Sequence, residues 1–429
     1  MIINYVSYIF FISLISIIFS AVDIKNINEN TQLKFTLKQN IYLSSSIFIN
    51  NKEYELPIDI SSDRLFVNTK DTSFNHNKNL VIEECPKYEL EFKSKTNVPI
   101  SFFDKNLILE EISYDELSNN INELSCDTKN GAIGLSPKSE KKVLNLLDQL
   151  NKSYLLKKYF TIYNNELIIG DLEEEIKKSK YISSSVLYPE QKWSINIQGL
   201  YFGEIDSYKK NNNNEFTINV LNNNYKKLNL DIEFNTLQRM IIIEYYQFDY
   251  INENIFKNKC NIKRNEQERF EGIYCDKNIL DKLPDFGFVI NNKLLPIQIN
   301  KLFIKDKNNP EEYLFLIGYS DIIWEKGPCL VGSYFFNDLG IKVIFDAENS
   351  KVYILSNDII DKIKIVNDYL VDGTQSILNN NSFSIYDLVL CFILISNFFG
   401  IIILLVSLYK EKFLGKMSNH IKKIKRMNK

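Results

Sequence analysis

The segment LPIDISSDRLFV, residues 56–67, is the most informative part of the sequence. Leu56 and Ile58 alternate with smaller or polar positions, as in a half-buried strand that ends at the carboxylate of Asp59. Two serines follow, and then the apolar residues 65–67. An Asp followed by Ser is common in turns, where it caps backbone N–H groups. A second interpretation is that a carboxylate placed at the tip of a strand has a chemical role.

The composition excludes several classes of function. The chain has 429 residues, enough for two or three domains, and its 51 Lys and Arg nearly balance its 54 Asp and Glu. This balance predicts no nucleic-acid partner. The two histidines, His76 and His420, are far apart, which argues against His-based nucleophilic catalysis and against a His-rich metal site. No CxxC or other metal-ligand spacing is present, so we expect no metal and no cofactor.

Two apolar segments indicate secretion and membrane anchoring. Residues 1–21 have the outline of a signal peptide, with a retained signal anchor as the alternative. Residues 385–409 predict a transmembrane helix, because the run is uncharged from 388 to 408 and about 20 residues cross a bilayer. The basic tail 410–429 is then cytoplasmic by the positive-inside rule, and it disfavours a buried core helix at 385–409. We therefore expect a single-pass type I protein of the secretory pathway or cell surface, with 358–384 as a luminal stalk.

The region between the two apolar segments is predicted to be mostly β. Segments such as QLKFTL, FTINVL and KVIFDA alternate apolar with polar residues or are rich in β-branched and aromatic residues. One amphipathic helix is predicted over residues 141–160 from the spacing of its leucines. Short runs of Asn, as at 211–214, are interpreted as surface loops.

The order of the segments resembles a pepsin-type aspartic protease, of the group that includes the plasmepsins. Residues 59–67 are similar to the family's Asp-Thr-Gly-Ser-Ser-x-Leu-Trp-Val and fit it without a gap. Residues 88–104 lie where the family has its flap hairpin. Further segments resemble the family in the expected order, namely GAIGLSPKS (131–139), YFTIYNNELIIGDL (159–172), KWSINIQGLYFGE (192–204), LPDFGFVINNKLLPI (283–297) and the closing segment 329–355.

The resemblance implies a mostly β, bilobal fold followed by the C-terminal transmembrane helix. We expect residues 22–185 to form an N-terminal β lobe and residues 186–357 a C-terminal β lobe. It also implies two catalytic carboxylates, one from each lobe, that share a proton because like charges so close cannot both ionise.

The first catalytic turn departs from the family pattern after its acid. Asp59 is kept, but Ile60 replaces the Thr whose hydroxyl bonds across the lobes. Ser61 replaces the Gly, where the family leaves no side chain. Ser62 fits the pattern.

The second turn is expected within residues 230–243. When this segment is aligned on Thr236, the catalytic position falls on Glu233, Phe234 replaces the Thr and Asn235 replaces the Gly. Asp231 lies two residues earlier on the same strand face, and another acid could also serve. Glu is one methylene longer than Asp, and misplacing a catalytic group by about 1 Å can cost about a hundredfold in rate.

The flap and the last motif differ as well. The family's Tyr-Gly-x-Gly becomes Phe-Lys-Ser-Lys, so Phe92 keeps the ring without its hydroxyl, and Lys93 and Lys95 replace flexible glycines. Ser333 stands where the family usually has Asp after Gly332.

These departures predict a pseudoprotease whose cleft binds an extended peptide or protein partner without cutting it. The first alternative is an active aspartic endopeptidase that uses Asp59 and Glu233. The second alternative is an adhesin or structural ectodomain whose cleft is filled by aromatic side chains. The aromatic candidates near the cleft motifs are Phe66, Phe92, Phe102, Phe103 and Phe234.

The cysteines fit a secreted domain. Five of the six precede the apolar segment 385–409, so at least one is unpaired or pairs between chains. Cys85 and Cys126 bracket the flap region, and Cys260 and Cys275 flank a charged loop, so we expect these two disulfides. Cys329 is expected to be free in a buried strand.

Overall fold

A computed structural model describes the chain between residues 31 and 366, with gaps, and all of these residues belong to the first of two compact units, 1–368 and 369–429. The predicted signal peptide 1–21, transmembrane helix 385–409 and tail 410–429 lie outside the described residues. The described ranges are 31–39, 43–68, 92–102, 107–117, 131–137, 145–189, 192–203, 216–219, 225–265, 269–306, 309–321, 329–337 and 339–366.

The chain is mostly β, and its first large sheet is built from the N-terminal third. This seven-stranded sheet has the order β2-β3-β4-β8-β5-β7-β6. Because β8 lies between β4 and β5, the chain returns to fill the gap beside the turn that follows β4. The strands are β2 (Lys38–Gln39), β3 (Leu43–Ile49), β4 (Lys52–Asp59), β5 (Leu65–Val67), β6 (Phe92–Phe102), β7 (Leu107–Leu117) and β8 (Gly131–Gly134).

The second large sheet has eleven strands, with the order β19-β18-β12-β14-β23-β15-β22-β17-β21-β20 and β16 paired to β17. Here β23 lies between β14 and β15, as β8 does between β4 and β5. The strands are β12 (Ser194–Gly203), β14 (Tyr225–Phe234), β15 (Ile241–Ile242), β16 (Asn261–Asn265), β17 (Phe270–Asp276), β18 (Asp285–Ile290), β19 (Lys293–Ile297), β20 (Phe303–Lys305), β21 (Glu312–Phe315), β22 (Ile317–Ser320) and β23 (Cys329–Val331).

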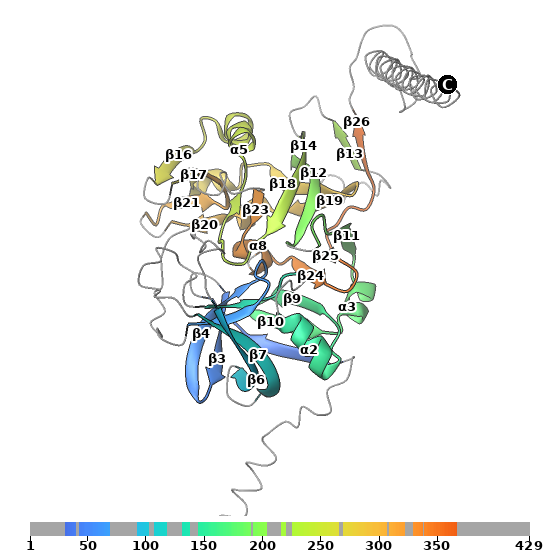
Figure 1. Cartoon of the computed structure of the whole chain (residues 1–429). Helices are drawn as coiled ribbons and strands as arrows, with labels where there is room; N and C mark the ends of the chain where they lie inside the picture. Colours follow the sequence, from blue (N-terminus) through green and yellow to red (C-terminus); the bar gives the residue numbers. More distant parts are fainter. Residues whose placement is uncertain are drawn as a thin grey trace, which may run out of the picture. The chain divides into compact units, whose positions relative to one another are not determined.

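A six-stranded sheet lies between the two large sheets and takes strands from both halves of the chain (Figure 1). Its order is β1-β10-β9-β24-β25-β11, so two late strands pair between early ones. The predicted ranges 22–185 and 186–357 therefore share one sheet. Its strands are β1 (Gln32–Thr36), β9 (Tyr159–Tyr163), β10 (Glu166–Gly170), β11 (Tyr181–Ser185), β24 (Lys342–Asp346) and β25 (Lys351–Leu355).

Pairs of asparagines close three of the hairpins. In each pair both residues have a positive φ, which two-residue hairpin turns of type I′ require and which Asn tolerates better than most residues. The frequent Asn in this sequence thus has a structural use at these turns. The pairs are Asn50–Asn51 between β3 and β4, Asn164–Asn165 between β9 and β10, and Asn291–Asn292 between β18 and β19.

The predicted long helix is shorter than expected. The helix α2 covers Leu146–Tyr154, because the Asn145 side chain caps its start and Leu155 adopts a left-handed conformation at its end. The chain then enters β9 at Tyr159 instead of continuing the helix to 160. The other helices are α3 (Glu173–Lys178), α5 (Tyr245–Ile251), a π-helical turn (Asn252–Phe256), α6 (Lys277–Leu280), a 3-10 turn (Ile299–Leu302) and α8 (Ser333–Asn337).

The start of the predicted stalk is part of the folded unit. Residues 363–366 form β26 (Ile363–Val366), which pairs in parallel with β13 (Phe216–Asn219). Ile359 and Ile360 are buried just before it. The expectation of a stalk from residue 358 is therefore corrected to a later start, because these apolar side chains pack on the body. Residues 367–384 lie outside the described part.

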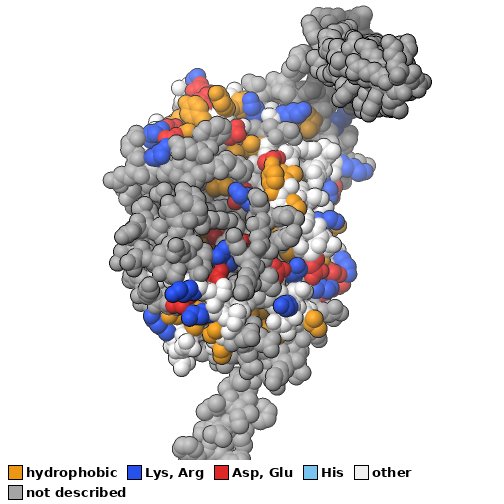
Figure 2. All heavy atoms as spheres, in the orientation of Figure 1, with side chains coloured by type: hydrophobic (Ala, Val, Ile, Leu, Met, Phe, Trp, Pro, Cys, Tyr) orange, Lys and Arg blue, Asp and Glu red, His pale blue; other side chains and the backbone are white. Residues whose placement is uncertain are grey.

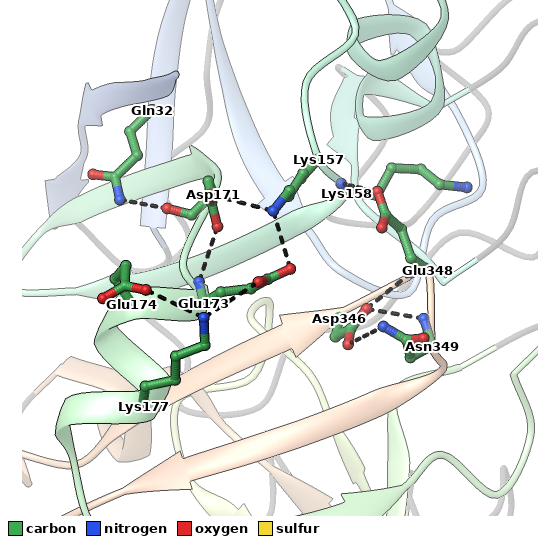
Figure 3. A network of polar contacts seen from close by, with 10 residues as sticks. All are labelled: Gln32, Lys157, Lys158, Asp171, Glu173, Glu174, Lys177, Asp346, Glu348 and Asn349. Atoms are coloured by element: carbon green, nitrogen blue, oxygen red, sulfur yellow. Dashed lines mark hydrogen bonds and ion pairs between the residues drawn. The ribbon is translucent and has the colours of Figure 1, made fainter. Parts of the chain in front are cut away.

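Polar contacts fasten the turns of the six-stranded sheet (Figure 3). Lys157 lies between Asp171 and Glu173, at 3.3 and 3.0 Å, and joins the start of α3 to the segment before β9. The backbone N–H of Lys158 donates to Glu348 at 3.0 Å, which links an early strand to the β24–β25 turn. Exposed ion pairs contribute little individually, so pairing and burial carry most of the stability here.

Aromatic rings fill the centre between the six-stranded sheet and the C-terminal sheet. Trp193 is fully buried, contacts Phe160 and Phe345, and donates its indole N–H to the Leu135 carbonyl at 2.8 Å. That hydrogen bond joins the start of the C-terminal sheet to the segment after β8. The core thereby holds the two large sheets together next to their central turns.

The cysteine predictions are confirmed where the structure describes them. Cys260 and Cys275 form a disulfide, and Cys329 is a free, buried thiol in β23. Burial raises the pKa of the Cys329 thiol to about 12. Cys85 and Cys126 lie outside the described residues.

Removing the disulfide with the double substitution Cys260→Ala and Cys275→Ala is expected to lower the free energy of unfolding by about 3 kcal/mol, because a loop of that size is no longer closed in the unfolded chain. The two cysteines are 15 residues apart. Denaturant unfolding under oxidising conditions measures the change. Unfolding curves that coincide with those of the unmodified protein would contradict the prediction.

Within the described part of the chain, no helix is long and apolar enough to span a membrane. In Figure 2, basic and acidic side chains are interspersed over the described part of the visible face.

Candidate functional site

The first turn holds its carboxylate with three donors. Asp59 ends β4, and its Oδ1 accepts hydrogen bonds from the Ser61 N–H at 2.8 Å, the Ser61 hydroxyl at 2.6 Å and the Ser62 N–H at 3.1 Å. All three residues are buried. Ser61 and Ser62, which the sequence placed in the cleft, therefore act here as turn residues that fix the direction of the Asp59 side chain.

A second turn repeats this pattern in the C-terminal sheet. Asn235 follows β14, and its Oδ1 accepts hydrogen bonds from the Leu237 N–H at 2.9 Å and the Gln238 N–H at 3.2 Å. These donors are the second and third residues after Asn235, as Ser61 and Ser62 are after Asp59. The amide of Asn235 is thus held in the way the carboxylate of Asp59 is held.

The two turns are in direct contact. The Thr236 hydroxyl donates to the Ile58 carbonyl and accepts from the Ile60 N–H at 3.3 Å. The residue after Asn235 is thereby bonded to the residues on either side of Asp59. Ile60 has no hydroxyl with which to return the contact, so this bridge is made from one side only.

Strand pairing defines the frame around Asp59. Ile133 of β8 pairs in parallel with Ile58 and in antiparallel fashion with Leu65. The strands β4 and β5 therefore flank β8 on its two sides, and the turn that begins at Asp59 crosses from one side to the other.

The same frame surrounds Asn235. Val331 of β23 pairs in parallel with Phe234 and in antiparallel fashion with Ile241. Phe234 immediately precedes Asn235, as Ile58 precedes Asp59, and Ile241 follows at the same separation as Leu65 does. Pairing register and side-chain hydrogen bonds thus agree that Asn235 is the counterpart of Asp59.

A glycine lies beneath each turn at the same place. A Cβ on Gly134 would lie 2.2 Å from the Arg64 carbonyl oxygen, and one on Gly332 would lie 2.3 Å from the Met240 carbonyl oxygen. Arg64 precedes Leu65 and Met240 precedes Ile241. Only glycine permits this close approach of the central strand to the returning chain.

Glu233, the predicted second acid, occupies a different position. It lies on β14 opposite Ser194 of β12, and its Oε2 is 2.7 Å from the Lys192 Nζ. The alignment on Thr236 treated that residue as the fourth of the motif, whereas the structure makes it the second. The signal that identifies Asn235 from sequence is the apolar run Ile241–Ile243, which follows Asn235 with the spacing that Leu65–Val67 has after Asp59.

The aromatic candidates do not gather around the two turns. Phe234 is buried in the core against Phe336 and Phe345, because its side chain points to the opposite face of β14 from Asn235. Phe66 is also buried. The side chains of Phe92 and Phe102, and the whole of Phe103, lie outside what the structure describes.

The described part of the predicted flap is the paired strand β6. Residues 92–95 belong to β6 and pair with β7. The carboxylate of Asp115 on β7 accepts from the Ser94 hydroxyl at 2.8 Å and from Arg64 at 3.0 Å. Asp115 therefore ties this strand to the returning chain of the Asp59 turn. Residues 88–91 and 103–104 of the predicted flap are outside the described part.

Of the two equivalent positions, Asp59 carries a carboxylate and Asn235 carries an amide. A carboxamide neither gains nor loses a proton in the ordinary pH range, so Asn235 can donate and accept hydrogen bonds but cannot act as a general acid or base. Proton sharing between two carboxylates is therefore not available to the pair Asp59 and Asn235. Among the described residues, no group of three His, Cys, Asp or Glu side chains is placed to hold a metal ion.

A separate cavity of about 320 Å³ lies in the C-terminal half, next to α6, β19 and the start of β24. Its walls include Leu283, Pro296 and Ile341, and the residues of the two central turns are not among its lining. The polar chemistry described above is thus separate from this cavity.

The comparisons with known proteins show the fold. No family model and no curated protein sequence matches the chain. Among solved structures, the chain is similar to the aspartic proteinase from Irpex lacteus, with a TM-score of 0.52 and 10% identity over 76% of this chain and 97% of the other. The chain therefore has the pepsin-like aspartic proteinase fold.

Proposed function

We propose that this protein is a secreted, membrane-anchored pseudoprotease that binds an extended peptide or protein segment between its lobes without cleaving it. The observation that carries the proposal is Asn235, which occupies the position symmetric with Asp59. Catalysis in this fold needs one carboxylate to activate water and a second, protonated one to polarise the scissile carbonyl. With an amide in the second position, no group there can take up or release the proton that this mechanism needs.

Loss of the second acid does not remove the means of binding. An extended peptide can be held by main-chain hydrogen bonds to the protein, with recesses for alternate side chains, and neither needs a catalytic acid. The junction retains its frame, because Thr236 bonds one turn to the other, and Gly134 and Gly332 let the central strand approach each turn closely. Selection for binding alone accounts for a preserved frame around a single carboxylate.

The alternative of an active endopeptidase with Asp59 and Glu233 has less support. Glu233 lies two residues before Asn235, the counterpart of Asp59, and its carboxylate is paired with Lys192. The alternative of a cleft filled by aromatic side chains also loses one of its candidates, because Phe234 lies in the core. The secretory location, the single membrane span and the partner remain part of the proposal.

The test uses the purified full-length protein and a mixed library of ten-residue peptides. We expect no cleavage between pH 3 and pH 7, and we expect retention of a subset of peptides on the immobilised protein. The variant Asp59→Ala should retain the same subset, since the proposal gives Asp59 no catalytic role. Cleavage that disappears in Asp59→Ala or Glu233→Ala would instead establish the active endopeptidase.

A further inference from the structure

A polar face of the C-terminal sheet continues from the junction of the two turns. Side chains alternate along a strand, so Glu233 shares the face of β14 that carries Asn235. On the neighbouring strand β12, Ser194 lies directly opposite Glu233, and Lys192 extends the row. Further along, Asn196 donates to Asp231 at 3.0 Å. A peptide that crosses the junction would therefore meet a row of polar groups on this side.

Glu233 is a buried charge with an exposed partner. Its side chain is 5% exposed, whereas that of Lys192, 2.7 Å away, is 37% exposed. Burying a carboxylate is costly unless a cation and hydrogen bonds compensate. Lys192 supplies the cation on a flexible chain that can leave for solvent. The carboxylate of Glu233 is therefore the fixed partner of this ion pair, and another cation can replace the ammonium of Lys192.

Ser194 adds a second buried polar group beside Glu233. Its side chain is fully buried, and its hydroxyl has no hydrogen-bond partner within the described part of the structure. Cross-strand pairing places it beside Glu233. A buried hydroxyl without a partner is uncommon and costs stability, so this hydroxyl keeps an unused capacity to donate and accept a hydrogen bond.

We propose that Glu233 and Ser194 form a recess for one basic side chain of the bound peptide, and that Lys192 occupies the recess in its absence. The proposal rests on the proposed peptide-binding function and specifies its ligand. The guanidinium of an Arg or the ammonium of a Lys replaces the Lys192 ammonium on Glu233, and Ser194 accepts a further hydrogen bond from it.

A ligand carboxylate that pairs with Lys192 is the less favourable alternative. Its negative charge would lie beside the buried carboxylate of Glu233, and like charges at close range repel each other. A basic ligand instead brings the opposite charge to Glu233 in place of the Lys192 ammonium. Charge complementarity thus favours a basic ligand.

The test measures binding of fluorescein-labelled ten-residue peptides to the full-length protein by anisotropy. The parent peptide is one that was selected from the library above. At each of its positions in turn, three versions are made, which carry Arg, its neutral analogue citrulline, or Glu. At one position, we expect the Arg peptide to bind about tenfold more tightly than the citrulline peptide, the scale of one charged hydrogen bond.

Variants assign this preference to the recess. In Glu233→Gln the preference for Arg should disappear, while the citrulline peptide binds within about twofold of its original affinity. In Lys192→Met the competing cation is gone, so the Arg peptide should bind more tightly than to the unmodified protein. The matched control Glu175→Gln removes a glutamate paired with Lys342 on the six-stranded sheet and should leave the preference unchanged.

The outcomes separate the two proposals. Binding of the citrulline peptide without any preference for Arg, or a preference that survives Glu233→Gln, overturns the basic recess and leaves peptide binding standing. If the Glu peptide binds more tightly than the Arg peptide, the ligand pairs with Lys192, and the basic recess is again overturned. If no peptide of any charge binds, peptide binding itself fails and the recess proposal fails with it.

Discussion

The variant Asn235→Asp is expected to be less stable than the unmodified protein by about 3 kcal/mol at pH 7, the scale of bringing two like charges together at a buried site. Asp and Asn have the same shape, so the change adds only a second carboxylate at the position that faces the Asp59 turn. Two like charges at one junction disfavour ionisation of both, and one carboxyl of the pair is then protonated at a higher pH than in the unfolded chain.

The sign of the pH dependence follows from proton linkage. A carboxyl whose pKa is higher in the folded variant binds more protons folded than unfolded, so the penalty shrinks as the pH falls and grows as the pH rises. Denaturant unfolding between pH 4 and pH 8 measures the difference between variant and unmodified protein. The exchanged variant, Asp59→Asn with Asn235→Asp, holds a single carboxylate again and should lose most of the penalty. A penalty independent of pH, or equally large in the exchanged variant, would contradict the placement of Asn235 opposite Asp59.

The variant Thr236→Val is expected to lower the free energy of unfolding by about 2–4 kcal/mol. Val keeps the shape of Thr but removes the hydroxyl that bonds to the Ile58 carbonyl and the Ile60 N–H. Both of these backbone groups are buried, and each buried polar group without a partner costs about 1–3 kcal/mol. Because Ile60 cannot return the contact, Thr236 alone makes this hydroxyl bridge.

Two substitutions control for the methyl exchange. Thr236→Ser keeps the hydroxyl and should cost no more than about 1 kcal/mol, the scale of a buried methyl group. Thr161→Val changes another fully buried Thr, in β9, whose hydroxyl has no partner among the described residues, and it should be neutral or slightly stabilising. Equal losses in Thr236→Val and Thr161→Val would show that the bridge contributes nothing to stability.

The fold was predictable because many local signals agreed in order along the chain. The strand that ends at Asp59, the two serines and the apolar return at Leu65 have their own periodicity and turn chemistry, and the structure bears out both the strand and the turn. The disulfide Cys260–Cys275 was predictable from its position around a charged loop. These features depend on neighbouring residues, which a sequence displays directly.

The second turn was mispositioned because its residue types no longer identify it. Asn235, Thr236 and Leu237 share only one hydroxyl residue with the family motif, and a nearby acid, Glu233, suggested a different register. The position of Asn235 is identified by β23, which pairs with β14 on one side and with β15 on the other. These contacts join segments that are far apart in the chain. The partner of Glu233 was equally hidden, because Lys192 lies far away in the sequence, two residues before the start of β12.

Other differences arise where tertiary packing overrides a local pattern. The leucine spacing over 141–160 favours a long helix, but pairing of β9 with β10 and β24 takes the last residues into a sheet. The segment 358–384 was expected to be a stalk, but its residues 363–366 form β26, which pairs with β13.

The order of the six-stranded sheet has a consequence for synthesis of the protein on the ribosome. Strand β9 is complete at Tyr163, yet its neighbour β24 begins only at Lys342. At about 5–20 residues per second, the intervening chain takes roughly 10–40 s to emerge. Throughout that interval β9 and β11 await their partners, and an unpaired edge invites association with other nascent chains. The first half of this protein is thus expected to depend on chaperones until its last strands are made, and truncation before residue 342 should yield an aggregating product instead of a smaller folded one.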